Sequence, residues 1–326
     1  MVKIAVAGPG PLTQLGLTVE VAHEIIDGLV ATGKHDILLL ARKDATPEQL
    51  IPGTTWVKVD YEDRKGLVKT LEGVHTVLSF IAAHLDTDNK SQKALIDAAI
   101  EAGVKRIAPS EWAGSDLTDL DWYNNKLEIR KYLEEKNREK KVIEYTLFQP
   151  GWFLNYIVGS RKTTKHIPTA AVPAVLVDHE RLRARVAGDP NNRISYTAIH
   201  DLVNIVVKAI DYEGEWPRVG GINGNTVSIA EEIAIGEKVR GKPYQVETLD
   251  VEEVKAGVLK TSWLPTLDHF PVSEAEREVY AKLLLRGILL NVANGTAPVS
   301  DEWNRIFPDY KFTTVEEILT EQLGKA

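Results

Sequence analysis

The start of the chain combines an apolar strand, a glycine-rich turn and a helix. Residues 3–7 run into Gly8-Pro9-Gly10, and after Gly16 apolar residues recur at helical spacing until Gly33. In a doubly wound α/β domain, glycines at such a turn let the backbone and the helix N-terminus approach a pyrophosphate, because no Cβ intervenes. The match to G-x-G-x-x-G is partial, since Thr13 stands where the third glycine is expected. A purely structural turn is the alternative interpretation.

The alternation of strand and helix continues through the first half of the chain. Further strands are expected at 36–41, 56–60, 75–81, 104–108 and 142–149, and further helices at 64–71, 92–102 and 121–135. Repeated β-α-β units predict a parallel sheet with right-handed crossovers, and a ligand across the carboxyl ends of its strands. The pattern changes near residue 150. Later helices are expected at 196–210 and 229–240, and mostly helical structure from 251 to 292.

Composition excludes several classes of function. The chain has 326 residues, enough for two domains, and a formal net charge of −8, which argues against a general nucleic-acid binder. It has no cysteine, and its eight histidines show no close metal-ligand pairing, so we expect no metal site. The opening apolar run is too short for a signal peptide, and no run of about 18 apolar residues occurs. We therefore expect a cytoplasmic protein without a membrane partner.

Two cations follow the second expected strand. Arg42 and Lys43 stand where a dinucleotide fold meets the adenosine ribose. An acidic residue at this place accepts hydrogen bonds from the 2′-hydroxyl of NAD, whereas a basic residue accommodates the 2′-phosphate of NADP. The pair therefore favours NADP(H), although two solvated charges at a strand end are the simpler alternative.

Lys126 lies on the apolar stripe of the expected helix 121–135. It falls four residues after Trp122 and three before Ile129, so its side chain should point toward the core. One explanation is a lysine that packs its stem and pairs with a carboxylate. The other is an ammonium at the edge of a pocket, whose pKa is lowered by desolvation so that it exchanges protons near neutral pH.

Several segments together resemble the NmrA-like and isoflavone-reductase-like group of atypical short-chain dehydrogenases. Besides the glycine loop, Arg42-Lys43 and Lys126 with Arg130, the resemblance is carried by segments 92–99, 102–106, 109–111, 149–153 and 307–317. It implies a Rossmann-type NADPH-binding domain, expected at 1–150, and a smaller α+β substrate lobe at 151–326, with an approximate boundary that allows the chain to cross back. Members of the group include reductases of aromatic secondary metabolites.

The resemblance also implies roles for single residues. In the group, the helix lysine matched by Lys126 is the general acid/base, in place of a Tyr-x-x-x-Lys pair. Here the position four residues before Lys126 is Trp122 and not a tyrosine, and Tyr123 is one residue away from that position. The expected cofactor-binding residues are Gly8, Gly10, Leu12, Thr13, Gln14, Arg42, Lys43, Ser79, Phe80, Ser110, Lys126, Pro150 and Gly151. The expected substrate residues are Trp112, Trp122, Trp152, Phe153 and Tyr156.

The sequence predicts an NADPH-dependent reductase of an aromatic or heteroaromatic small molecule, as a monomer or homodimer. Two departures from the group's pattern affect this prediction, Thr13 in the glycine loop and Trp112 where a smaller aromatic is commoner. Two other functions stay open. One is a non-catalytic NADP-sensing regulator that binds a protein partner, against which the presence of Lys126 argues. The other is a non-redox cyclisation or isomerisation on the same fold.

Overall fold

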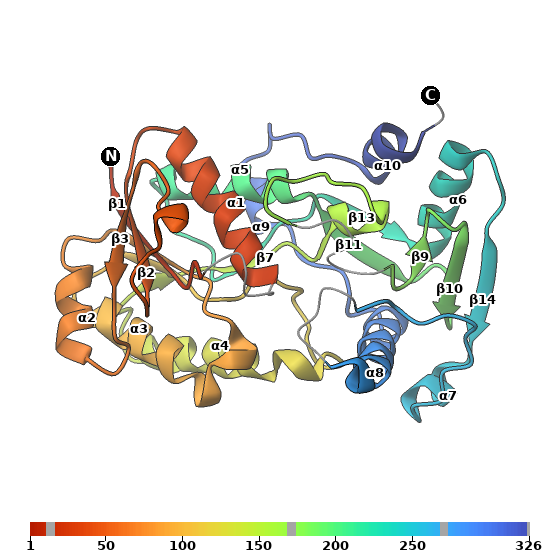
Figure 1. Cartoon of the computed structure of the whole chain (residues 1–326), viewed down its shortest axis with the longest axis horizontal. Helices are drawn as coiled ribbons and strands as arrows, with labels where there is room; N and C mark the ends of the chain where they lie inside the picture. The colour runs from red at the N-terminus through yellow and green to blue at the C-terminus, as the bar shows by residue number, and fades with distance from the viewer. Residues whose placement is uncertain (11–16, 168–173, 268–272, 325–326) are drawn as a thin grey trace. The chain divides into compact units, whose positions relative to one another are not determined.

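The chain forms two compact units. The computed structural model describes residues 1–10, 17–167, 174–267 and 273–324 (Figure 1). The first unit comprises Met1–Trp112, Trp122–Phe148 and Val203–Gly220, and the second comprises Ala113–Asp121, Gln149–Leu202 and Gly221–Ala326. The chain therefore passes between the units several times, so neither unit is a single continuous segment.

A six-stranded sheet forms the centre of the first unit. Its strands are β1 (Lys3–Ala7), β2 (Asp36–Ala41), β3 (Thr54–Lys58), β4 (Thr76–Ser79), β5 (Arg106–Ala108) and β6 (Glu144–Tyr145). Their order is β3-β2-β1-β4-β5-β6, and every pairing is parallel. This is the order of a Rossmann sheet, in which the direction of winding changes between the first and fourth strands. The predicted Rossmann-type fold is confirmed.

Helices cover both faces of this sheet. They are α1 (Leu17–Ala31), α2 (Arg64–Leu71), α3 (Lys90–Glu101), α4 (Asn124–Lys136) and α5 (Ile199–Asp211). The helices α2, α3 and α4 lie on one face and α1 on the other (Figure 1). Residues 4–7 of β1 are completely buried, as expected for a central parallel strand that is covered on both sides.

A buried ion pair secures the returning segment of the first unit. Arg106 Nε lies 2.7 Å from Glu144 Oε1 on the neighbouring strand. The same guanidinium donates hydrogen bonds to the carbonyl oxygens of Tyr212, at 2.6 Å, and Gly214, at 2.5 Å. A buried arginine is tolerated when its donors are satisfied in this way, so Arg106 ties the segment after α5 to the sheet.

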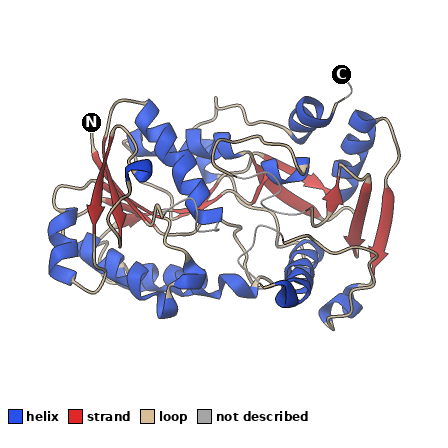
Figure 2. Ribbon diagram, in the orientation of Figure 1, coloured by secondary structure: helices blue, strands red, loops and turns tan. Residues whose placement is uncertain are grey.

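The second unit contains two small three-stranded sheets and several helices (Figure 2). One sheet has the order β13-β11-β8, with β8 (Trp152–Phe153), β11 (Arg193–Thr197) and β13 (Asn225–Ser228). The other has the order β14-β10-β9, with β9 (Val177–Asp178), β10 (Arg183–Ala187) and β14 (Gln245–Leu249). The helices are α6 (Ile229–Arg240), α7 (Val251–Lys255), α8 (Glu274–Ala293), α9 (Glu302–Ile306) and α10 (Val315–Leu323). A separate two-stranded sheet pairs β7 (Leu147–Gln149) with β12 (Val219–Gly221).

Some of the predicted elements were wrong in extent or type. The helix expected at 196–210 begins only at Ile199, because residues 193–197 form β11 between two other strands. The strand expected at 142–149 is split between two sheets as β6 and β7. The mostly helical stretch expected from 251 to 292 contains the short α7, which ends before Gly257 at a φ of 82°, and then α8 from Glu274. Glycine adopts this left-handed conformation readily and ends helices for that reason.

Candidate active site

Lys126 is held inside the first unit by backbone carbonyl groups. Its side chain is buried on α4, next to Ile129 and Leu133, as its spacing predicts. Nζ donates hydrogen bonds to the carbonyl oxygens of Ser110, at 2.8 Å, and Glu111, at 2.6 Å. Two carbonyl acceptors stabilise an ammonium without neutralising its charge. The lysine is therefore fixed in position and can exchange a proton from that position.

The surroundings of Lys126 make its ammonium unusually acidic. Burial lowers its pKa from 10.5 to about 8, the nearby Glu111 carboxylate opposes this change, and Arg130 reinforces it. Desolvation disfavours the charged form of any base, which explains why burial dominates. The Nζ atom also lies 5.0 Å from the centre of the Tyr123 ring, whose face attracts a cation. A lysine with a pKa of about 8 can act as an acid or as a base near neutral pH.

A buried carboxylate and an arginine lie next to this lysine. Arg130 Nε donates to Glu111 Oε1 at 3.0 Å, and Arg130 Nη2 donates to the same oxygen. The Glu111 side chain is only 1% exposed, so the pair compensates a charge that would otherwise be costly to bury. Because the Glu111 backbone carbonyl also accepts from Lys126, the ion pair fixes one of the two acceptors of the ammonium.

Trp112 packs within the first unit. Its ring stacks on Phe80 at 4.5 Å between centroids and on Phe148 at 5.3 Å. Its Nε1 donates to the carbonyl oxygen of Ser79 at 2.8 Å. The backbone of Trp112 has a φ of 41°, which a bulky side chain rarely adopts and which the stacking must hold in place. These contacts give Trp112 a packing role beside Ser110 and Glu111, while its predicted substrate contact stays a prediction.

The described part of the glycine loop lies close to the end of β4. Gly8 has a φ of 83°, and its N–H donates to the Leu40 carbonyl at 3.1 Å. A Cβ built on Gly8 would lie 2.8 Å from the carbonyl carbon of Phe80 and from the amide nitrogen of Ile81. Only glycine fits here, as at the first glycine of a dinucleotide-binding turn. The predicted cofactor residues Leu12, Thr13 and Gln14 lie outside the described residues.

The other predicted cofactor residues of the first unit lie near carboxyl ends of its strands. Arg42 and Lys43 are exposed directly after β2, and neither side chain makes a hydrogen bond or ion pair with any other described residue. Ser79 ends β4, while the Phe80 side chain is buried. The buried hydroxyl of Ser110 has no hydrogen-bond partner among the described residues. These residues fit NADP(H). The glycine turn at Gly8 suits the pyrophosphate, and the cations Arg42 and Lys43 suit the 2′-phosphate. The Ser110 hydroxyl can bond to a polar atom of the cofactor.

Pro150 and Gly151 belong to the second unit. Gly151 has a φ of 67°, and a Cβ on it would lie 2.5 Å from the carbonyl oxygen of Ser195. The close packing of the chain against β11 requires glycine at this position. Pro150 is buried beside it. These contacts explain the two residues structurally, and their role toward a cofactor stays a prediction.

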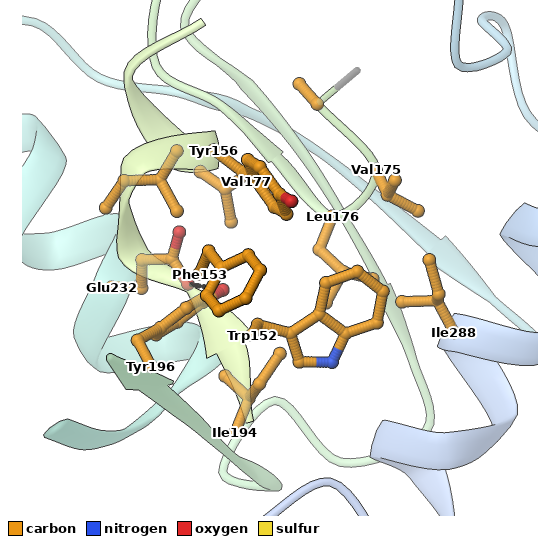
Figure 3. Close-up of a pocket in the computed structure, with 12 residues that line it drawn as sticks. Trp152, Phe153, Tyr156, Val175, Leu176, Val177, Ile194, Tyr196, Glu232 and Ile288 are labelled. Carbon is orange, nitrogen blue, oxygen red and sulfur yellow. Dashed lines mark hydrogen bonds between the residues drawn. The ribbon is translucent and has the colours of Figure 1, made fainter. Parts of the chain in front are cut away.

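An apolar pocket lies within the second unit. Three of the predicted substrate residues, Trp152, Phe153 and Tyr156, line it together with aliphatic side chains of β9, β11 and α8 (Figure 3). The cavity volume is about 40 Å³, and the wider hollow that includes open solvent is about 400 Å³. The other two predicted substrate residues, Trp112 and Trp122, both belong to the first unit. Trp122 lies in a short 3₁₀ helix directly before α4. The prediction therefore grouped residues that the structure assigns to two separate units.

The pocket wall also contains a polar chain that sequence reasoning missed. Tyr196 donates its hydroxyl to Glu232 Oε2 at 2.9 Å (Figure 3). His179 Nε2 lies 3.1 Å from Glu232 Oε1, and His179 Nδ1 lies 2.8 Å from the Tyr244 hydroxyl. The partners of Glu232 are 36 and 53 residues away in sequence, so no local motif indicates them.

The described ranges contain neither a metal-binding cluster of side chains nor a helix that could span a membrane. Within residues 1–10, 17–167, 174–267 and 273–324, there is no group of three or more histidine, cysteine or acidic side chains that could hold a metal ion. Across the same ranges, no helix combines the length and the apolar character needed to cross a bilayer.

Proteins similar to this chain are reductases and synthases of plant and bacterial origin. Eugenol synthase 1 from Petunia hybrida is 26% identical over 278 residues, covering 82% of this chain and 81% of the relative. Phenylcoumaran benzylic ether reductase PT1 from Pinus taeda is 25% identical with the same coverage. A crystal structure of isoflavone reductase matches with a TM-score of 0.68 and 21% identity, covering 98% of both chains. An NADPH-dependent quinone oxidoreductase from Escherichia coli, solved with NADPH, has a TM-score of 0.66 and 22% identity, covering 98% of this chain and 99% of its own.

A family model extends this similarity to nearly the whole chain. The model of the NmrA-like family matches residues 14–319, which include β2 to β6, α4 with Lys126 and the pocket of the second unit. The chain belongs to the NmrA-like family.

Proposed function

We propose that this protein is an NADPH-dependent reductase of an aromatic or heteroaromatic small molecule, with Lys126 as the general acid/base. The observation that carries the proposal is the buried Lys126 ammonium, held by two backbone carbonyls in a Rossmann unit and given a pKa of about 8 by burial. NADPH supplies the hydride. The names of the similar proteins, which include reductases of phenylcoumaran and isoflavone substrates, support the same class.

Residues of the first unit would bind the cofactor. Gly8 lets the loop pack directly against the end of β4, as the first glycine of a dinucleotide-binding turn does, and Arg42 and Lys43 are available to the 2′-phosphate of the cofactor. A guanidinium can hold a phosphate with two parallel hydrogen bonds, whereas an ammonium acts as a point charge. Arg42 is therefore the residue on which preference for NADPH over NADH should depend most.

Lys126 would supply the proton that balances hydride addition. Its Nζ–H bond breaks as the proton passes to the substrate, and the resulting amine is neutral. The two carbonyl oxygens that accept from Nζ would keep it in one position through this change, because a neutral amine still has two N–H groups to donate. Positioned acid/base groups accelerate reactions by about 10²- to 10⁴-fold.

The pocket of the second unit would bind the aromatic ring of the substrate. Four aromatic side chains and several aliphatic ones line it, which is the usual character of small-molecule sites. The Phe153 and Tyr156 rings meet edge to face at 5.5 Å between centroids, so they present a preformed surface to a third ring.

The test combines cofactor titration with turnover. Wild type should show saturable NADPH fluorescence and should oxidise NADPH with some member of a panel of aromatic carbonyls, imines and activated alkenes. Lys126→Ala should bind NADPH normally and lose turnover by about 100-fold or more. Lys131→Ala is the matched control, since Lys131 is exposed on the same helix. Full activity of Lys126→Ala, or no saturable NADPH binding by wild type, would refute the proposal.

A further inference from the structure

The pocket of the second unit contains a buried carboxylate whose only basic partner among the described residues is a histidine. Glu232 is 1% exposed on α6 and is one of the residues that line the pocket. No lysine or arginine among the described residues forms an ion pair with it; its side-chain partners there are His179 and Tyr196. Buried carboxylates are normally paired with a cation, because the uncompensated charge is costly to desolvate.

The partners of Glu232 form a chain of hydrogen bonds. With its proton on Nε2, His179 donates to Glu232 Oε1 and accepts at Nδ1 from the hydroxyl of Tyr244. Tyr196 donates to the other carboxylate oxygen, and burial followed by the adjacent Glu232 charge raises the pKa of Tyr196, which keeps its proton. This assignment of the protons follows from the hydrogen-bond network.

Aromatic rings surround the same space. Trp152, Phe153, Tyr156 and Tyr196 line the pocket with Glu232, and Figure 3 shows the Phe153 and Tyr196 side chains close to the carboxylate. The faces of aromatic rings attract cations, and they do so more strongly when water is excluded. A carboxylate within a set of aromatic side chains is therefore complementary to an organic ammonium group. A neutral hydroxyl would leave the buried charge uncompensated.

We propose that this pocket binds an aromatic ligand that carries a protonated amine, with the ammonium against Glu232 and the ring among Trp152, Phe153 and Tyr156. The inference rests on the proposed function and narrows it, since the substrate of the reductase would then be a basic aromatic compound. Glu232 acts as the anchor of the cation, and Tyr196 and His179 hold the carboxylate in position.

The test compares three small probes that share a phenyl ring on a short chain and differ in the polar group and its charge. The probes are 2-phenylethylammonium, 2-phenylethanol and phenylacetate, titrated calorimetrically into the full chain without cofactor. The wild type should bind the ammonium at least about tenfold more tightly than the alcohol, as expected for a desolvated cation–carboxylate pair, and phenylacetate most weakly. Glu232→Gln should bind the ammonium and the alcohol about equally tightly, because the amide keeps the shape of the carboxylate but not its charge.

The chain offers a matched control. Glu231→Gln removes the same charge one residue earlier on α6, where Glu231 is half-exposed and closes the capping box with Ser228. Glutamine can replace glutamate in that motif, so this variant should keep the wild-type preference. Unchanged NADPH binding and thermal melting of Glu232→Gln would show that it is folded. The comparison of probes on wild type needs no variant.

Three outcomes would overturn the inference. They are equal or weaker binding of the ammonium compared with the alcohol, no binding of any probe, and an ammonium preference that survives in Glu232→Gln. None of them refutes the NADPH-dependent reductase, which is measured separately as NADPH oxidation and its dependence on Lys126. Conversely, an ammonium preference without saturable NADPH binding would support the pocket and refute the reductase.

Discussion

Replacing Lys126 by methionine should change how the stability of the protein depends on pH. Lysine in an unfolded chain has a pKa of 10.5, whereas burial lowers that of Lys126 to about 8 in the folded protein. Between these two values the unfolded chain holds a proton that the folded protein has released. Stability therefore rises with pH through this window, and below about pH 8 the folded state has the full cost of the buried charge.

The structure sets the size of this effect. A pKa difference of one is worth about 1.4 kcal/mol, so a fall from 10.5 to about 8 corresponds to about 3 kcal/mol. The free energy of unfolding of wild type minus that of Lys126→Met should therefore increase by about 3 kcal/mol between pH 7.5 and pH 10.5. Methionine has similar length and no charge, so it removes the titration and keeps most of the packing beside Ile129 and Leu133.

Urea unfolding at a series of pH values measures this difference. Other groups titrate in the same range, but they do so in both proteins and cancel in the comparison. Lys131→Met is the control, because Lys131 is exposed on the same helix and should give a difference that does not depend on pH. A pH-independent difference for Lys126→Met as well would show that Lys126 titrates like a solvated lysine, and the acid/base argument would fail.

Three further substitutions test the cofactor loop and the lysine site. Gly8→Ala places a Cβ 2.8 Å from backbone atoms of Phe80 and Ile81, directly after β4, at a φ of 83°. It should lower the free energy of unfolding by about 1–3 kcal/mol and with it the melting temperature. An unchanged melting curve would contradict this. Arg42→Gln should weaken NADPH binding by about tenfold and leave NADH binding unchanged in fluorescence titrations, and equal losses for both would contradict a 2′-phosphate contact. Glu111→Gln removes a carboxylate that raises the pKa of Lys126 and leaves Arg130, which lowers it. The fall of kcat/KM with rising pH should then begin at lower pH than in wild type, and an unmoved profile would exclude this coupling.

The fold could be predicted because its strongest signals are local. The strands β1 and β2 are continuous apolar runs, and their limits were predicted to the residue. The burial of Lys126 follows from its position on one stripe with Ile129 and Leu133. Such signals depend on spacing along one element, which the sequence contains in full.

The remainder of the site depends on contacts between distant segments. Tyr196 was placed at the start of a helix, but β11 is a strand because β8 and β13 pair with it on either side. That pairing brings Tyr196 to Glu232, and His179 reaches the same carboxylate from β9's end. The packing of Trp112 between Phe80 and Phe148 likewise joins three segments that are distant in sequence. No spacing rule within one segment indicates these contacts.

Hydride transfer is the step that separates a reductase from a cofactor-sensing regulator or a non-redox enzyme on this fold. The most direct measurement uses NADPH with both C4 hydrogens of the nicotinamide replaced by deuterium, with mass analysis of the product formed by wild type and by Lys126→Ala. The proposal predicts one deuterium in the wild-type product and a product yield at least about 100-fold lower for the variant. A confirmed product without deuterium would contradict it.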